Sequence, residues 1–255
     1  MGNSKNTSKF YLFKLSVPIF FSNVAIPMVG LIDTGLMGHL NNEKFLAAIS
    51  IATSVITMIF WSFGFLRMGT VGLVSQELGR NNYNEIILVF IRNLILASFI
   101  GLAIIFFKEP IILLVDHFFK NSEETQSLIN GYISIRILSA PAELIIYVLA
   151  GLYLGLQKTF ISSLMISIFC LGNIILSLVL VIHYDLEIFG VAAGTAIAAY
   201  ITVIIFLIFS YFQLKHKLTI SITYKKIFNT SKIFKLFNIN FDIFIRTILL
   251  SFSFL

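Results

Sequence analysis

The residue of this sequence best suited to chemistry is Asp33, a carboxylate inside an apolar stretch that covers residues 13–40. An ionisable side chain within a membrane span is costly, so it faces a bundle interior or a water-filled cavity and is a candidate functional group. Asp33 is therefore predicted to bind a proton or Na⁺. The alternative is a structural carboxylate that caps a neighbouring helix. Pro18 and Pro27 lie in the same stretch, and each removes a backbone hydrogen bond and favours a bend.

Polar residues also interrupt later apolar stretches. Arg136 and Glu143 are seven residues apart, so they share one face of a helix, but a continuous helix holds them too far apart for direct contact. Each is predicted to have a buried ion-pair partner on another helix or to serve in the function of the protein. Asn173 and Ser177 are one turn apart, and Thr195 follows in the next stretch. Ordinary hydrogen bonding between helices is sufficient to account for this second group.

The elements that must position these residues are membrane-spanning helices. Apolar residues make up 58% of the 255 and charged residues 12%, about half the charged fraction of a soluble domain. A span of about 20 residues crosses the hydrocarbon core of a bilayer. Six apolar stretches are long enough: 13–40, 45–78, 86–107, 128–156, 160–183 and 189–212. The predicted fold class is an all-α polytopic membrane protein, with the second span ending at Gly79-Arg80-Asn81-Asn82.

The loops between these stretches differ in charge. Lys and Arg gather in alternate loops, with Arg80 and Arg92 counted between the second and third spans, while the other loops are mainly acidic. This asymmetry predicts a multi-pass membrane protein with a cytoplasmic N-terminus. The same clustering explains the net charge of +6 without a nucleic-acid partner.

The chain is expected to divide into three parts. Residues 1–212 form a six-helix transmembrane lobe, and residues 213–240 form a basic cytoplasmic connector that resembles an amphipathic helix on anionic lipid. Residues 241–255 begin a seventh helix, too short to span. The apolar segment 111–119 is also too short and is predicted to lie at the membrane interface.

The sequence lacks the residue patterns that several kinds of enzyme and metal site require. The sequence has no phosphate-cradling glycine loop followed by Lys-Ser/Thr, no HExxH pattern and only one cysteine, Cys170. Its four histidines are scattered at or beyond the ends of the spans. An enzyme, a cofactor and a resident metal site are therefore not expected, although Asp33 could bind Na⁺.

Three stretches of the sequence resemble the DinF-like branch of the MATE (multidrug and toxic compound extrusion) transporters. They are PMVGLIDTGLMGHL in the first span, GFLRMGTVGLVSQELGRNN in the second, and IRILSAPAELIIYVLAGLYLGLQKT in the fourth, followed by GNIILSLVL and FGVAAGTAIAAY. The likeness follows nearly the whole chain in order. It implies two six-helix lobes that export organic, often cationic compounds in exchange for H⁺ or Na⁺.

The resemblance also implies roles for individual residues. Asp33 looks like the coupling acid of the family's first helix. Asn173 and Thr195 look like its polar neighbours, and Tyr132 looks like a fourth-helix member of the same network. Protonation of Asp33 would then change its hydrogen bonds to Asn173 and Thr195, and the first helix would bend at its prolines.

The sequence departs from the family pattern in two places. The fifth helix has Ser177 where an acid is usual, so Glu143 is a candidate for an additional acid. The chain also stops inside the seventh helix, which predicts a fragment, a frameshifted gene or a lobe that pairs with a second chain. The alternatives are a flippase of lipid-linked substrates from the same superfamily, a non-transporting membrane subunit or degenerate pseudogene product (a non-functional or partner-dependent fragment), and a membrane enzyme.

Overall fold

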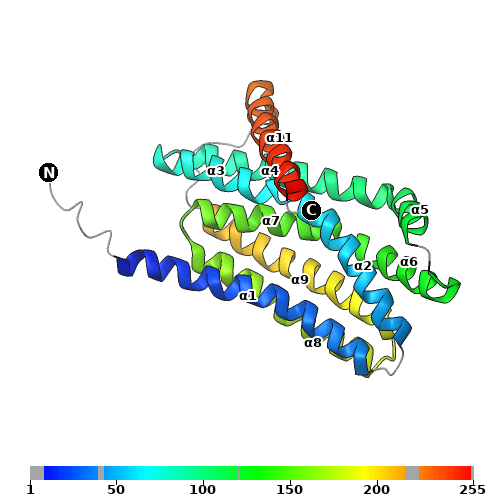
Figure 1. Cartoon of the computed structure of the whole chain (residues 1–255). Coiled ribbons are helices and arrows are strands. Elements are labelled where there is room, and N and C mark those ends of the chain that lie inside the picture. Colours follow the sequence, from blue (N-terminus) through cyan, green and yellow to red (C-terminus); the bar gives the residue numbers. More distant parts are fainter. Residues whose placement is uncertain (1–8, 40–42, 120, 216–223, 254–255) are drawn as a thin grey trace.

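The computed structural model describes residues 9–39, 43–119, 121–215 and 224–253, and every regular element within these ranges is a helix (Figure 1). The helices are α1 (Lys9–His39), α2 (Glu43–Ser62), α3 (Phe65–Gly79), α4 (Tyr83–Phe106), α5 (Lys108–Phe118), α6 (Glu123–Ile137), α7 (Ala140–Gly155), α8 (Thr159–Ile182), α9 (Glu187–Lys215), α10 (Tyr224–Ile227) and α11 (Thr230–Ser253).

Most of the expected spans correspond to long apolar helices. Within the described residues, four stretches are long and apolar enough to cross a membrane, namely α2 with α3, α4, α8 and α9. The pair of α6 and α7 makes a fifth if its bend of 50° lies within one span. The expected first span corresponds to α1, whose 31 residues reach about 46 Å. The prediction of an all-α polytopic membrane protein is confirmed.

Local sequence explains where these helices end. The break predicted at Gly79–Asn82 is present: α3 ends at Gly79, and Asn81 has a φ of 55°, a left-handed conformation that asparagine tolerates. The Asn82 side chain then accepts a hydrogen bond of 3.2 Å from the backbone N–H of Glu85 and caps α4.

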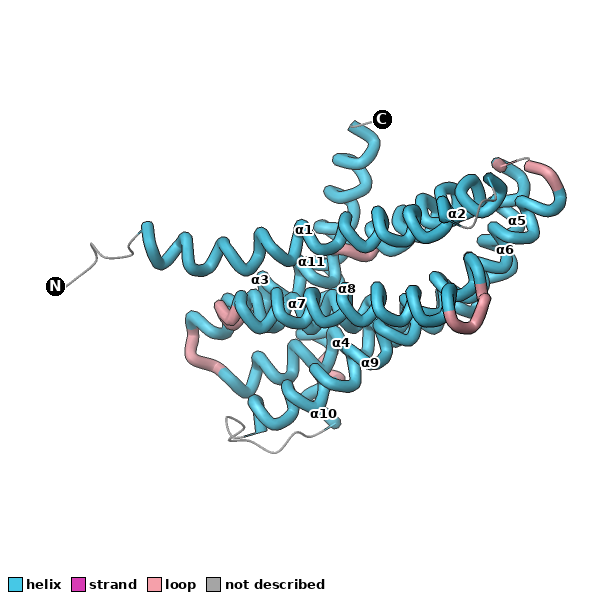
Figure 2. Tube along the Cα trace, turned by 90° about the horizontal axis from the view of Figure 1, so that it is seen from below, coloured by secondary structure: helices cyan, strands magenta, loops and turns pink. Residues whose placement is uncertain are grey.

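The long helices form one bundle in which α8 packs against α1 and α9, and α7 packs against α3, α4 and α9 (Figure 2). Small residues allow the closest contacts. A Cβ on Gly101 of α4 would lie 2.4 Å from the Cα of Pro141 in α7, and one on Gly151 would lie 2.7 Å from Thr70 in α3. Close backbone approach at small residues is the usual way in which membrane helices pack.

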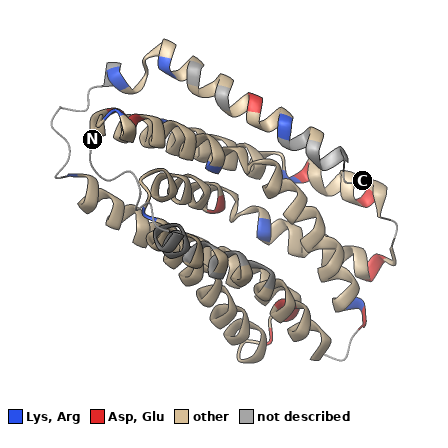
Figure 3. Ribbon diagram, turned by 60° about the vertical axis from the view of Figure 1, so that its left-hand side comes forward, with Lys and Arg blue, Asp and Glu red and all other residues tan. Residues whose placement is uncertain are grey.

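The surface of the bundle fits a lipid environment. Large apolar side chains are widely exposed, including Phe99, Leu171 and Ile204. The positions of Lys, Arg, Asp and Glu are sparse along the long helices (Figure 3). In a bilayer these apolar side chains face hydrocarbon, so their exposure has no hydrophobic cost.

Two expectations about the connecting segments are wrong. Arg92 is not a loop residue; it lies within α4 and is 6% exposed. The helix expected from residue 241 begins at Thr230. Its start is not apparent from hydropathy, because Lys232 and Lys235 make the first turns polar without ending the helix. Within the expected connector, residues 216–223 lie outside the described part. The division into a lobe, a connector and a further helix stays a prediction.

The short segment after α4 is a separate helix. α5 has only 11 residues and contains residues 111–118 of the stretch predicted to lie at the interface. Asp116 of α5 accepts hydrogen bonds from Gln126 at 2.6 Å and Asn130 at 2.9 Å, both on α6. These contacts hold α5 against the start of α6.

Candidate functional site

The Asp33 carboxylate lies inside the bundle. Its residue is 6% exposed, and its Oδ1 atom is buried without a hydrogen-bond partner. An ionised carboxylate can only accept hydrogen bonds, and a buried acceptor without a donor costs free energy. Binding a proton or a cation removes that cost, so this oxygen is a place where a coupling ion could bind.

Two residues of α6 lie within electrostatic reach of Asp33. They are Tyr132, which is 2% exposed, and Arg136. The guanidinium of Arg136 lies close enough to the Tyr132 hydroxyl to act on it electrostatically. Because arginine can only donate hydrogen bonds, it does not occupy the hydroxyl hydrogen of Tyr132, which can be donated to an acceptor.

Arg136 and Glu143 form a direct ion pair, so the prediction that they are too far apart for contact is wrong. Their side chains are only 11% and 12% exposed. The prediction assumed a continuous helix, but α6 ends at Ile137, α7 begins at Ala140, and the two helices meet at 50°. The bend brings residues seven positions apart side by side. Pro141 in the first turn of α7 is the sequence signal for this break.

Further contacts hold this ion pair in place. The Oγ of Ser139 lies 2.9 Å from Oε1 of Glu143 and 2.5 Å from a guanidinium nitrogen of Arg136. The ring of Phe60 on α2 lies 5.5 Å from the Arg136 guanidinium carbon, within the range of a cation–π contact. Neither Ser139 nor Phe60 was identified from sequence, because nothing about their types or spacing separates them from ordinary helix residues.

The polar residues of α8 and α9 form a second buried group. Asn173 donates from Nδ2 to the Thr195 hydroxyl at 2.8 Å, and Ser177 donates to Oδ1 of Asn173 at 3.1 Å. Thr195 donates in turn to the backbone carbonyl of Val191 at 2.9 Å. Both hydroxyl hydrogens are therefore committed, and one amide hydrogen of Asn173 remains to meet an acceptor.

A glycine makes this arrangement possible. A Cβ on Gly194 would lie 2.7 Å from the backbone nitrogen of Ser177 and 2.8 Å from its Oγ. Only a residue without a side chain lets α9 approach α8 this closely. The approach brings Thr195 within hydrogen-bond distance of Asn173.

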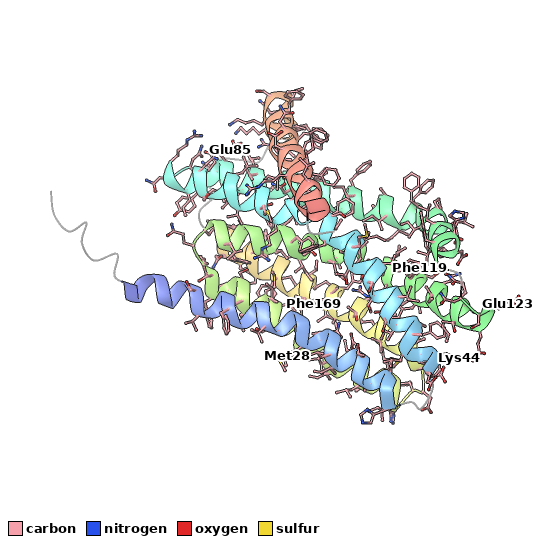
Figure 4. All side chains as sticks on the ribbon, in the orientation of Figure 1. Met28, Lys44, Glu85, Phe119, Glu123 and Phe169 are labelled. Carbon is pink, nitrogen blue, oxygen red and sulfur yellow. The ribbon has the colours of Figure 1, made fainter. Side chains whose placement is uncertain are left out.

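The structure thus places the predicted residues in two groups. Asp33 lies with Tyr132 and the Arg136–Glu143 pair, and the other group consists of Asn173, Ser177 and Thr195. The helices that carry them are packed together, since α1 lies along α8 (Figures 1 and 4).

The remaining expectations concern prolines and metals. Pro18 and Pro27 lie within the single helix α1, and their side chains lie outside the described set, so bending at them stays a prediction. Among the described residues, no group of three or more His, Cys, Asp or Glu side chains could hold a metal ion.

A family model described as MatE matches residues 18–182. The chain belongs to the MatE family. This MatE chain is 34% identical over 194 residues to the DNA damage-inducible protein F of Escherichia coli (strain K12), a match that covers 76% of the chain and 42% of that protein. It is 24% identical over 244 residues to the multidrug export protein MepA of Staphylococcus saprophyticus, which covers 94% of the chain and 52% of that protein. The resemblance to the DinF-like branch is confirmed.

Solved structures agree on the fold. A MOP superfamily transporter from Pyrococcus furiosus superimposes with a TM-score of 0.83 at 18% identity, over 95% of this chain and 53% of that one. An outward-facing multidrug resistance MATE family transporter gives the same TM-score, identity and coverage. The chain spans about half the length of the curated relatives it matches.

Proposed function

We propose that this MatE chain is a lobe of a secondary antiporter that exports small organic compounds, including cations, in exchange for H⁺ or Na⁺. The observation that carries the proposal is the buried Asp33 carboxylate, whose Oδ1 has no hydrogen-bond partner inside a membrane bundle. Relatives named for multidrug export support the class of substrate. Arg136 is neutralised by Glu143, which weighs against the strongly cationic cavity of a lipid-linked substrate flippase.

The proposed cycle depends on which donors face Asp33. When the carboxylate is charged, it can accept from the hydroxyl hydrogen of Tyr132 and from the unused amide hydrogen of Asn173. When it carries a proton or meets Na⁺, these bonds are lost or rearranged. α1 then shifts relative to α6 and α8, and Pro18 and Pro27 provide the places where it bends. The shift displaces the exported compound.

The proposed setting is a bacterial inner membrane with the N-terminus of the chain in the cytoplasm. The expected partners are the lipid bilayer, a small organic substrate and a second six-helix lobe, supplied by the same gene or by another chain. The loop charges of the sequence support the orientation. The coverage of about half of each relative supports the need for a second lobe.

Glu143 is proposed to supply the second acid that Ser177 lacks, acting through Arg136. Glu143→Gln keeps the side-chain volume and an oxygen that can accept from Arg136 and Ser139, but it removes the negative charge. The positive charge of Arg136 is then no longer neutralised, so its electrostatic attraction for the Asp33 carboxylate becomes stronger. We expect several-fold slower export and a displaced pH profile, measured as substrate efflux from loaded vesicles at a series of pH values.

A matched control for this substitution is Glu124→Gln. Glu124 pairs with Lys44, which lies at one end of the bundle (Figure 4), and the two side chains are 62% and 47% exposed. This change should leave export as it was. If Glu143→Gln also leaves the rate and the pH profile unchanged, Glu143 has no part in coupling.

The proposal as a whole is tested by complementation. The chain is expressed in cells that lack their own exporters, alone and together with any polypeptide encoded directly downstream of Leu255. Survival in the presence of toxic organic cations is then measured. Restored survival in either arrangement supports the export function. Loss of survival in both, with the chain present in the membrane, contradicts it.

A further inference from the structure

Arg92 is a buried guanidinium far from the proposed coupling site. It lies in α4, and its side chain is 5% exposed. One nitrogen donates to Oε1 of Glu85, in the first turn of the same helix, at 2.8 Å. The other donors reach across the molecule: Nε donates to the backbone carbonyl of Ile227 at 2.8 Å, and another nitrogen donates to that of Lys226 at 2.6 Å.

The two carbonyls are the last of α10, a helix of only four residues. Carbonyls at the C-terminal end of a helix have no partner within it, and a cation placed there is favourable. The planar fork of an arginine can donate in several directions at once, which a lysine ammonium on a flexible stem does poorly. Arg92 therefore binds both the end of α10 and the carboxylate of Glu85.

The first turns of α11 are held on the same face. Lys232 of α11 lies 3.6 Å from Glu85, which Figure 4 shows beside the start of that helix. Leu236, one turn further, is 6% exposed and lines a small pocket with Leu73 of α3 and Val89 of α4. Polar and apolar contacts thus continue from α10 into α11.

A second close contact lies further along α11. Asn240 is 3% exposed, and its Nδ2 lies 3.5 Å from Oδ1 of Asn93 on α4. A Cβ on Gly69 of α3 would lie only 2.0 Å from Oδ1 of Asn240, so this amide fits only against a glycine. The fit fixes where α11 crosses α3 and α4 (Figures 1 and 2).

We propose that Arg92 is a positioning residue that anchors residues 226–240 to α3 and α4. The segment after α9 is then not a loose tether between two bodies. Residues 226–240 are held against α3 and α4 and move together with these helices. Any movement of a following lobe relative to this one must then be absorbed beyond Asn240. This anchor is independent of the proposed coupling at Asp33.

The anchor is tested by hydrogen–deuterium exchange of the purified chain in lipid nanodiscs. We expect Arg92→Ala and Arg92→Lys to raise the exchange rate of backbone amides in residues 224–236 roughly tenfold, because local opening no longer breaks the guanidinium bonds. Amides of α7 and α8 should keep their wild-type rates. A general loss of stability would raise exchange there as well.

Arg80→Ala is the matched control. Arg80 pairs with Glu77 at the same end of the bundle, but its side chain is 64% exposed and, among the described residues, it makes no hydrogen bond to α10. Its removal should leave residues 224–236 protected. Wild-type exchange of residues 224–236 in Arg92→Lys would overturn the anchor, whatever Arg92→Ala shows.

Discussion

Asp33→Asn should reduce pH-driven export to the rate of membranes without the protein. The substitution keeps the size of the side chain and its ability to hydrogen-bond, but the amide cannot take up or release a proton at physiological pH. Export driven by an ion that binds at Asp33 then has no carrier for that ion. The measurement is substrate efflux from vesicles under an imposed pH gradient, with the chain in whichever arrangement supports export.

The control for this variant is Asp185→Asn. Asp185 is an exposed carboxylate between α8 and α9 with a φ of 52°, a conformation that asparagine adopts readily. It should export at the wild-type rate. Persistent pH-driven efflux in Asp33→Asn, at a rate close to that of Asp185→Asn, would refute coupling through Asp33.

Arg136→Ala should have the largest effect on stability. It leaves Glu143 as an uncompensated charge in a largely buried site. Breaking one side of a buried ion pair costs about 3–5 kcal/mol. We expect the free energy of unfolding, measured by denaturant titration in detergent micelles, to fall by that amount. The double variant Arg136→Leu/Glu143→Leu should recover much of the loss, because no charge is left unpaired.

Lys44→Ala provides the comparison. Its ion pair with Glu124 is exposed, so its loss should cost at most about 1 kcal/mol. If Arg136→Ala and Lys44→Ala lower the free energy of unfolding equally, the pair at the bend of α6 and α7 does not stabilise the bundle as argued.

The spans could be predicted because their signal is local. Twenty apolar residues in a row fix both the helix and its environment, since the bilayer leaves no other partner for the backbone. An acid such as Asp33 stands out against that background. The break after Gly79 is equally local, because left-handed conformations suit Asn81.

The features that sequence missed depend on tertiary geometry. In a continuous helix, Arg136 and Glu143 would be too far apart for contact. They meet because the chain bends between α6 and α7, and the angle of that bend cannot be derived from the spacing of residues in the sequence. Arg92 was counted with the loop charges because a tally of Lys and Arg cannot tell a snorkelling side chain from a buried one. Its partners, the carbonyls of residues 226 and 227, lie more than 130 positions away in the chain.

The central claim is that Asp33 takes up and releases a proton or exchanges it for Na⁺ within this lobe. Infrared difference spectra of the purified chain in lipid, recorded between acidic and alkaline pH, test this without requiring transport. The exposed carboxyls of the chain contribute to the carboxylic acid carbonyl band that appears on acidification, so the result lies in the difference between variants. One component of this band should be present in the wild-type protein and in Asp185→Asn, and it should be missing in Asp33→Asn. A pH-dependent carboxyl spectrum that is identical with and without Asp33 would contradict the account.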